Sequence, residues 1–232
     1  MLEKKRLFIA GDSTACLYPH CGEKNRFPRT GWGQVVGRFL NDVEVIDLAL
    51  SGRSSKSFKT EENYKILKNE IRSGDYLVIQ FGHNDAKSED PSRYTSVNDG
   101  TYSNSIMEFV NIARMVGANP ILATSISRNK TSDPKLEEYV DAIRLIAIKK
   151  NLPLMDLYKA TNDYINRVGT AKGSEMFMIL EPHDKRFIND PRFNGSEFYN
   201  KYTIDNTHLN INGALIVAQF AADMLTNIMN NI

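Results

Sequence analysis

Residues 7–14 read LFIAGDST, an apolar run that ends in a glycine, an acid and two hydroxyl residues. Three structures fit such a stretch: a phosphate-binding turn after a strand, a nucleophile on a turn, or simply the first strand of an α/β core meeting its loop. Each of the three requires different partners further along the chain. The rest of the sequence therefore decides among them.

Apolar, β-rich runs alternate with helical patterns along the whole chain. The runs predict strands at residues 7–10, 43–48, 76–81, 120–124 and 154–156, and helical periodicity predicts helices at 33–40, 61–71, 104–116, 135–149 and 213–229. Strands that alternate with helices of this length form βαβ units, so we expect an α/β protein whose five-stranded parallel sheet lies in a three-layer α/β/α sandwich. Because no repeat, low-complexity tract or linker interrupts the pattern, we expect a single domain over residues 1–232.

The composition excludes several classes of partner. The 232 residues include 29 basic and 28 acidic side chains, so no overall field attracts nucleic acid or an anionic membrane. No apolar run approaches the roughly 20 residues that span a bilayer. The first residues, MLEKKRLFIAGDS, lack the apolar core of a signal peptide. We expect a cytoplasmic protein, or a secreted one if a leader has been removed; the oligomeric state stays open.

Cys16, His20 and Cys21 lie within six residues and raise the question of a metal site. With no second Cys/His pair nearby they match no standard zinc spacing, so we expect ordinary loop residues and no metal. Two cysteines agree with a reducing compartment, although oxidation would let them close a small loop.

Residues 170–204 do not fit the alternation of strands and helices. They mix aromatic and charged residues with Gly and Pro, and their periodicity is weak. A loop of this length in a compact domain is usually functional or mobile. Two alternatives stay open: a surface excursion that covers one end of the sheet, or a segment that faces the substrate.

Polar residues that can carry chemistry follow the predicted strands. They are Gly11-Asp12-Ser13, Gly52-Arg53-Ser54-Ser55, Gly82-His83-Asn84-Asp85 and, before the last helix, Asp205-Asn206-Thr207-His208. Ligands of open parallel sheets bind outside the carboxyl ends of the strands, where these residues would meet. A serine, an asparagine, an aspartate and a histidine at one rim suit acyl transfer. The G-x-G-x-x-G, P-loop and G-x-S-x-G motifs are absent, which argues against nucleotide binding and an ordinary α/β-hydrolase.

In these four blocks the sequence resembles the SGNH (GDSL-type) hydrolases, and their order and spacing match over nearly the whole chain. The stretches TGWGQ at 30–34, GRSSKSF at 52–58 and FGHND at 81–85 resemble more narrowly the rhamnogalacturonan acetylesterases, which remove acetyl groups from pectic polysaccharide. The resemblance implies the flavodoxin-like SGNH fold and a serine esterase that needs no metal or organic cofactor.

The resemblance also implies a role for each site residue. Ser13 would be the nucleophile, His208 its general base and Asp205 the acid that orients the imidazole, the last two on a short loop. The backbone amides of Ser13 and Gly52 and the side-chain amide of Asn84 would form the oxyanion hole. Taken singly, each residue has an ordinary structural explanation, such as a turn serine, a helix-capping aspartate or a loop histidine. Their joint placement at one rim favours catalysis.

Five further residues, four of them in these loops and one, Trp32, in the TGWGQ stretch, are candidates for other roles. We expect Asp12 and Asp85 to accept hydrogen bonds that brace these loops. Arg53, His83 and Trp32 are candidate substrate contacts, with packing at a helix start as the alternative for Trp32.

The expected substrate is an acetylated oligosaccharide, most specifically acetylated rhamnogalacturonan, because basic loop residues suit a uronate-bearing sugar. The alternatives are a GDSL-type esterase or thioesterase, a lysophospholipase-like hydrolase, an acetylxylan esterase, or a carbohydrate-binding module that has lost turnover.

Overall fold

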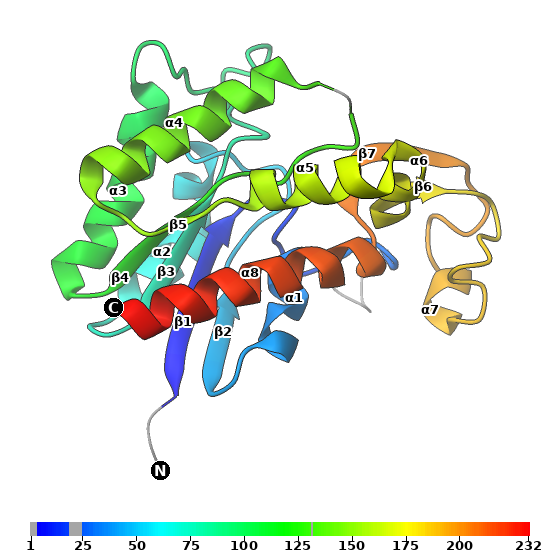
Figure 1. The fold of residues 1–232 in the computed structure, drawn as a ribbon, viewed down its shortest axis with the longest axis horizontal. Coiled ribbons are helices and arrows are strands. Elements are labelled where there is room, and N and C mark those ends of the chain that lie inside the picture. The colour runs from blue at the N-terminus through cyan, green and yellow to red at the C-terminus, as the bar shows by residue number, and fades with distance from the viewer. Residues whose placement is uncertain (1–3, 19–24, 131) are drawn as a thin grey trace.

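The computed structural model describes residues 4–18, 25–130 and 132–232. Its centre is a five-stranded sheet with the strand order β2-β1-β3-β4-β5, in which all neighbours are parallel (Figure 1). The strands are β1 (Lys5–Gly11), β2 (Val43–Asp47), β3 (Tyr76–Gln80), β4 (Asn119–Ala123) and β5 (Leu154–Met155). Each overlaps one predicted strand, and the predicted fold class is confirmed.

Helices cover both faces of this sheet. One face carries α2 (Glu62–Glu70), α3 (Thr101–Val116) and α4 (Pro134–Lys150), and the other carries α1 (Trp32–Val36), α5 (Leu157–Val168) and α8 (Ile211–Asn231). Successive side chains of β1 alternate between the two layers: Leu7 and Ile9 belong to the α8 side, Phe8 and Ala10 to the α3 side. A strand buried on both faces is a continuous apolar run, as the sequence LFIA is.

Short 3₁₀ turns fill out two of the connections. The turn at Gly37–Phe39 extends α1, so the predicted helix at 33–40 covers both, and a second turn at Ser57–Thr60 precedes α2.

Helix α5 was missing from the sequence prediction. Its buried residues, Leu157, Tyr158, Thr161 and Ile165, have helical spacing that could have revealed it. Asp156, which the prediction placed in the fifth strand, instead begins the helix: its side chain accepts a hydrogen bond from the amide of Lys159 at 3.1 Å.

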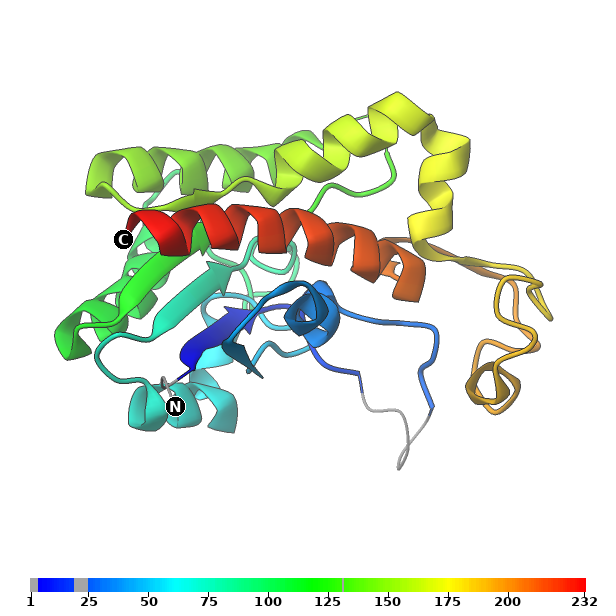
Figure 2. The same cartoon turned by 60° about the horizontal axis from the view of Figure 1, so that its bottom comes forward.

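The segment without periodicity forms a separate structural feature beyond the sheet. After α6 (Thr170–Gly173) and a 3₁₀ turn (Ser174–Met176), β6 (Phe177–Leu180) pairs with β7 (Thr203–Leu209) as an antiparallel hairpin that carries α7 (Pro191–Asn194) between its strands. We call residues 177–209 the hairpin lobe; it projects from the body of the molecule (Figure 2). A small apolar cluster supports it, made of Phe27 from the segment before α1 and of Met178, Leu180, Phe187, Phe193 and Phe198 from the lobe.

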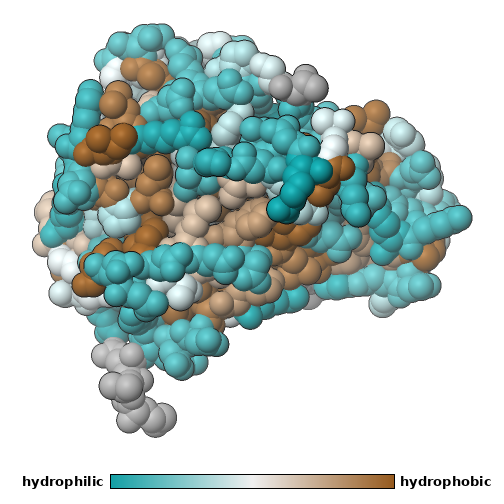
Figure 3. All heavy atoms as spheres, viewed as in Figure 1, coloured by the Kyte–Doolittle hydropathy of each residue, from teal (hydrophilic) through white to brown (hydrophobic). Residues whose placement is uncertain are grey.

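The closing helix α8 is long and apolar. Among the described residues it is the helix that length and composition would allow to cross a membrane, a test that core helices of soluble proteins also pass. Val217, Ala221 and Leu225 of α8 are buried in the main core, and this packing accounts for its apolar character. Figure 3 shows a band of apolar residues along this helix, with further apolar residues elsewhere on the same face.

Candidate active site

Ser13 lies in a tight turn directly after β1. The amides of Ala15 and Cys16 donate to the Asp12 carbonyl at 3.2 and 3.1 Å, which closes the turn. The Asp12 side chain accepts hydrogen bonds from the amide and the hydroxyl of Thr14, at 2.9 and 2.8 Å. This is the bracing role expected of Asp12. The Ser13 side chain therefore projects from a backbone that is fixed on both sides.

Two glycines of the TGWGQ stretch let helix α1 press against this turn. A Cβ atom on Gly31 would lie 2.3 Å from the backbone carbon of Ala15, and one on Gly33 would lie 2.7 Å from the Ala15 oxygen. The first amides of α1 then donate to the turn, from Trp32 to the Thr14 carbonyl at 2.9 Å and from Gly33 to the Ala15 carbonyl at 3.0 Å. Only glycine permits so close an approach of the two backbones.

Ser13, His208 and Asp205 form one hydrogen-bonded chain. His208 Nε2 lies 2.9 Å from Ser13 Oγ, and His208 Nδ1 lies 2.6 Å from Asp205 Oδ2. When Nδ1 donates its proton to the carboxylate, Nε2 is left as the acceptor for the serine hydroxyl. Burial raises the pKa of the Asp205 carboxyl, but the hydrogen bonds and charge of His208 outweigh it and hold that pKa below its usual range.

The Asp205–His208 pair sits in a bulge of strand β7, not in the short loop that the sequence suggested. Phe177 pairs with Leu209 and the next residue, Met178, pairs with Asp205, so residues 206–208 bulge out of the ladder. Asp205 Oδ1 accepts the amides of Thr207 and His208, each at 3.0 Å. The aspartate thus builds the turn that aims the histidine at Ser13. Helix α8 is capped by Asn210 instead, whose side chain accepts two amides of its first turn.

The loops after β2 and β3 lie beside the serine turn. The Leu50 amide donates to the Gly11 carbonyl at 3.0 Å, which sets Ser51 and Gly52 next to the end of β1. Gly52 has φ +77°, a conformation that side chains rarely adopt. Asn84 Nδ2 donates to the Arg53 carbonyl at 3.1 Å, so one of its two hydrogens ties the loops together and the other remains for a ligand.

Asp85 braces the same two loops, as expected. Its carboxylate accepts the Ser55 hydroxyl at 2.5 Å and the Thr95 hydroxyl at 2.8 Å. Burial raises the pKa of Asp85 to about 6, in opposition to these hydrogen bonds.

The structure corrects the expectation for Trp32. Its side chain is 0% exposed, so it cannot stack on a sugar at the surface. Its indole Nε1 donates to Gln80 Oε1 at 2.7 Å, and Gln80 Nε2 donates to the hydroxyl of Thr14 at 2.9 Å. Trp32 therefore supports the serine turn from the core, which is the alternative that the sequence left open.

The other two candidate substrate contacts lie in different surroundings. Arg53 is half-buried and its Nε lies 2.5 Å from Glu61 Oε1. His83 is 3% exposed, with Nδ1 3.3 Å from Asp12 Oδ2 and with Nε2 buried without a hydrogen-bond partner. Contact of either residue with a substrate stays a prediction.

Sequence reasoning counted Arg29 only among the basic loop residues, and it did not predict the contacts that Arg29 and Arg93 make at the site. Arg29 Nη2 lies 3.1 Å from Asp205 Oδ2. Arg93 Nη1 lies 3.7 Å from the position that a Cβ atom on Gly52 would take, while its Nε pairs with Asp90 at 3.0 Å. The sequence offers no spacing signal for either contact, because each joins segments far apart in the chain.

The described residues contain no group of three His, Cys, Asp or Glu side chains that could hold a metal ion. Cys16 is a buried free thiol, and burial raises its pKa to about 12. His20 and Cys21 lie outside the described residues, so the expectation for that cluster stays a prediction.

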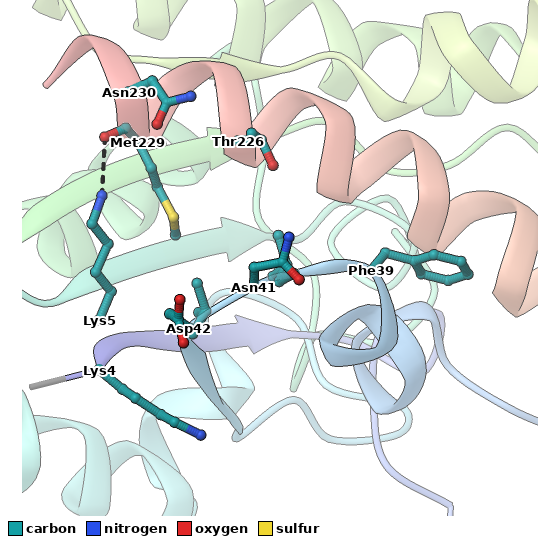
Figure 4. Close-up of a pocket in the computed structure, with 10 residues that line it drawn as sticks. Lys4, Lys5, Phe39, Asn41, Asp42, Thr226, Met229 and Asn230 are labelled. Carbon is teal, nitrogen blue, oxygen red and sulfur yellow. Dashed lines mark hydrogen bonds between the residues drawn. The ribbon is translucent and has the colours of Figure 1, made fainter. Parts of the chain in front are cut away.

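A cavity of about 760 Å³ lies at the opposite, amino-terminal edge of the sheet. Figure 4 shows it between the start of β1, the segment before β2 and the end of α8, where the Lys5 amine donates to the Met229 carbonyl. None of its lining residues belongs to the predicted site, so the cavity is separate from the Ser13 rim.

The sequence also matches a known protein family. The model of the GDSL-like Lipase/Acylhydrolase family matches residues 7–220, and the chain belongs to this family. It is a carboxylic ester hydrolase.

Three known proteins are similar to this chain. The rhamnogalacturonan acetylesterase RhgT of Bacillus subtilis is 32% identical over 224 residues, which cover 94% of this chain and 88% of the relative. The probable rhamnogalacturonan acetylesterase YesY of the same organism is 33% identical over 180 residues, with 75% and 80% covered. The crystal structure of Axe2, an acetylxylan esterase from Geobacillus stearothermophilus, shares the fold with a TM-score of 0.64 at 18% identity, covering 97% of this chain and 96% of that one.

Proposed function

We propose that this protein is a serine esterase that removes O-acetyl groups from carbohydrate, with acetylated rhamnogalacturonan oligosaccharides as its substrate. The observation that carries the proposal is the chain from Ser13 Oγ through His208 to Asp205, with contacts of 2.9 and 2.6 Å. The names of the two Bacillus relatives support the choice of sugar.

In the first half of the reaction, His208 Nε2 takes the Ser13 proton while Ser13 Oγ attacks the acetyl carbonyl. The oxyanion of the tetrahedral intermediate faces the amides of Ser13 and Gly52 and the free hydrogen of Asn84 Nδ2. As the carbon–oxygen bond to the sugar breaks, the imidazolium returns the proton to the departing hydroxyl. Ser13 is left acetylated.

In the second half, water attacks the acetyl-Ser13 ester with His208 as the base. Collapse of the second intermediate releases acetate and restores the serine hydroxyl. Asp205 holds the imidazole in orientation and stabilises its positive charge in both halves.

The charge around Gly52 bears on the choice of substrate. Arg53 is engaged with Glu61, and Lys56 donates to the Pro91 carbonyl at 2.8 Å. Arg93 has Nη1 3.7 Å from the position of a Cβ atom on Gly52 and is one-third exposed, so it is a candidate partner for a substrate carboxylate. An acetyl group needs only a small pocket, whereas each added methylene would need apolar wall worth about 0.8 kcal/mol.

The proposal is tested with a panel of esters. Acetate release from acetylated rhamnogalacturonan oligomers should exceed release from acetylxylan oligomers, and kcat/KM should fall from p-nitrophenyl acetate to butyrate and octanoate. Arg93→Met should narrow the preference for the pectic substrate and leave p-nitrophenyl acetate unaffected. Hydrolysis of octanoate at the rate of acetate would indicate a lipid-type esterase instead, and a preference for acetylxylan would retain the chemistry with another sugar.

A further inference from the structure

Arg29 is held in place by two aromatic rings beside the catalytic chain. Its guanidinium carbon lies 5.8 Å from the centre of the Tyr18 ring and 5.7 Å from that of Phe198. The side chain is only 16% exposed, and Tyr18 in turn donates its hydroxyl to the Ser13 carbonyl at 2.9 Å. Arg29, from the segment before α1, therefore contacts both Tyr18, which supports the serine turn, and Phe198 of the hairpin lobe.

The position of Arg29 matters because of which carboxylate oxygen it reaches. Asp205 Oδ1 is occupied by the amides of Thr207 and His208. Oδ2 lies 2.6 Å from His208 Nδ1 and 3.1 Å from Arg29 Nη2, so the imidazole and the guanidinium share one oxygen atom. A permanent cation on that oxygen draws electron density away from the imidazole and repels the imidazolium that forms during catalysis.

We propose that Arg29 is a positioning residue that shares the Asp205 carboxylate with His208 and thereby sets the acid limb of the pH–activity profile. The proposal rests on the function proposed above. By disfavouring the imidazolium, Arg29 keeps His208 available as a base at lower pH than an unshared aspartate–histidine pair would allow.

The backbone of this segment does not depend on the guanidinium. Arg29 forms a β-bridge with Asn210, and the Thr30 amide donates to the Leu209 carbonyl at 3.0 Å. Replacement of the side chain therefore removes the charge and leaves the backbone contact with the hairpin lobe.

Other titratable groups lie on the elements around His208, and their effects on the pH profile have to be separated from the effect of Arg29. They are Asp12, Cys16 and Tyr18 after β1, Asp47 at the end of β2, Arg53 after β2, His83, Asp85 and Arg93 after β3, and Arg128 after β4. Asp47 and Asp85 are the main concerns, because burial raises their pKa values to about 8 and about 6, both within the range of the assay. The profile is therefore also recorded for Asp47→Asn and for Asp85→Asn, each of which should leave the midpoint of the acid limb in place.

The test is the pH dependence of kcat/KM on p-nitrophenyl acetate. Arg29→Met should move the acid limb upward by about 0.5–1 pH unit, and Arg29→Lys, which keeps the charge, should hold it near the wild-type position. Arg26→Met is the matched control: this arginine of the same segment is 4.0 Å from Glu197 and should leave the profile unchanged. A merely structural role would lower the plateau without moving the limb, and that result would overturn the proposal.

A second measurement does not depend on turnover. In the Ser13→Ala background, the NMR titration of the His208 ring proton, assigned by its loss in His208→Gln, should show the same upward move for Arg29→Met. An unchanged titration midpoint would refute the role of Arg29. Retention of activity by Ser13→Ala alone would refute the proposed function, so the two failures are distinct.

Discussion

Replacement of Asn84 by alanine should lower kcat by roughly 10²–10³, which corresponds to about 2.7–4 kcal/mol of transition-state stabilisation. The two hydrogens of this side-chain amide have different roles in the proposed mechanism. One donates to the Arg53 carbonyl at 3.1 Å and holds the loops after β2 and β3 together. The other is the one that the proposed mechanism assigns to the oxyanion. Only the second interaction strengthens as charge develops, so the loss belongs to kcat and KM should change less.

The first hydrogen predicts a smaller, separate effect on stability. Loss of the hydrogen bond to the Arg53 carbonyl should lower the free energy of unfolding by about 1 kcal/mol. Asn119→Ala is a matched control, because Asn119 Nδ2 makes a similar side-chain bond of 3.2 Å to the Asp75 carbonyl at the opposite edge of the sheet. The control should lose comparable stability and keep its kcat.

Steady-state kinetics on p-nitrophenyl acetate and urea unfolding of both variants test this reasoning. If Asn84→Ala raises KM while kcat holds, Asn84 binds the ground-state ester and is not an oxyanion donor. If Asn119→Ala loses as much kcat as Asn84→Ala, the effect comes from general loosening of the fold.

Three further predictions concern the nucleophile, its support and a buried carboxyl. Ser13→Ala should lower kcat by about 10⁶ with little change in Tm, and a serine-reactive phosphonate should label wild type but not this variant. Trp32→Phe should lower the free energy of unfolding by about 1–3 kcal/mol, because Gln80 loses its indole donor. The KM for oligosaccharides should stay unchanged. A raised KM with a normal Tm would mean that Trp32 contacts the sugar after all. Burial raises the pKa of Asp47 in the folded protein to about 8, above its value in the unfolded chain, so the folded form binds the extra proton. The stability of the wild type should therefore fall as pH rises from about 4 to 8, and thermal melts of Asp47→Asn should show a weaker dependence on pH. An unaltered slope would contradict the buried-carboxyl interpretation.

The sheet could be predicted from sequence because its signals are local. Strand β3 is buried at every position, and the residues LFIA before Gly11 place side chains in the cores on both faces of the sheet. Apolar runs and the helical periodicity between them are therefore sufficient to predict the sheet. The pairing of Ser13 with Asp205 and His208 came from the resemblance, and the structure brings these three side chains together.

What the sequence could not predict depends on contacts between distant segments. The partly buried strand β7 lacks the alternation that marks a strand, because its bulge turns residues 206–208 out of register. Arg29 and Asp205 are 176 residues apart, and no spacing links them. Trp32 next to two glycines is compatible with a surface platform as well as with a helix start, and only the close approach of the Ala15 backbone decides between them.

Because Asp205 and His208 both lie at the bulge in β7, the number of residues has to be exact only over the short stretch between them. An added residue between Asp205 and His208 would move the imidazole by up to about 3.3 Å, the rise of one extended residue, and so break its 2.9 Å contact with Ser13. The stretch between the two strands of the hairpin lobe, residues 181–202, packs in the apolar cluster with Phe27, Met178 and Leu180, and it approaches the catalytic chain through β7 and through the contact of Phe198 with Arg29. Insertions and deletions in this stretch that keep Phe198 in place should alter the surface near the rim without moving His208, so a loop can be varied or grafted there with the proposed chemistry preserved.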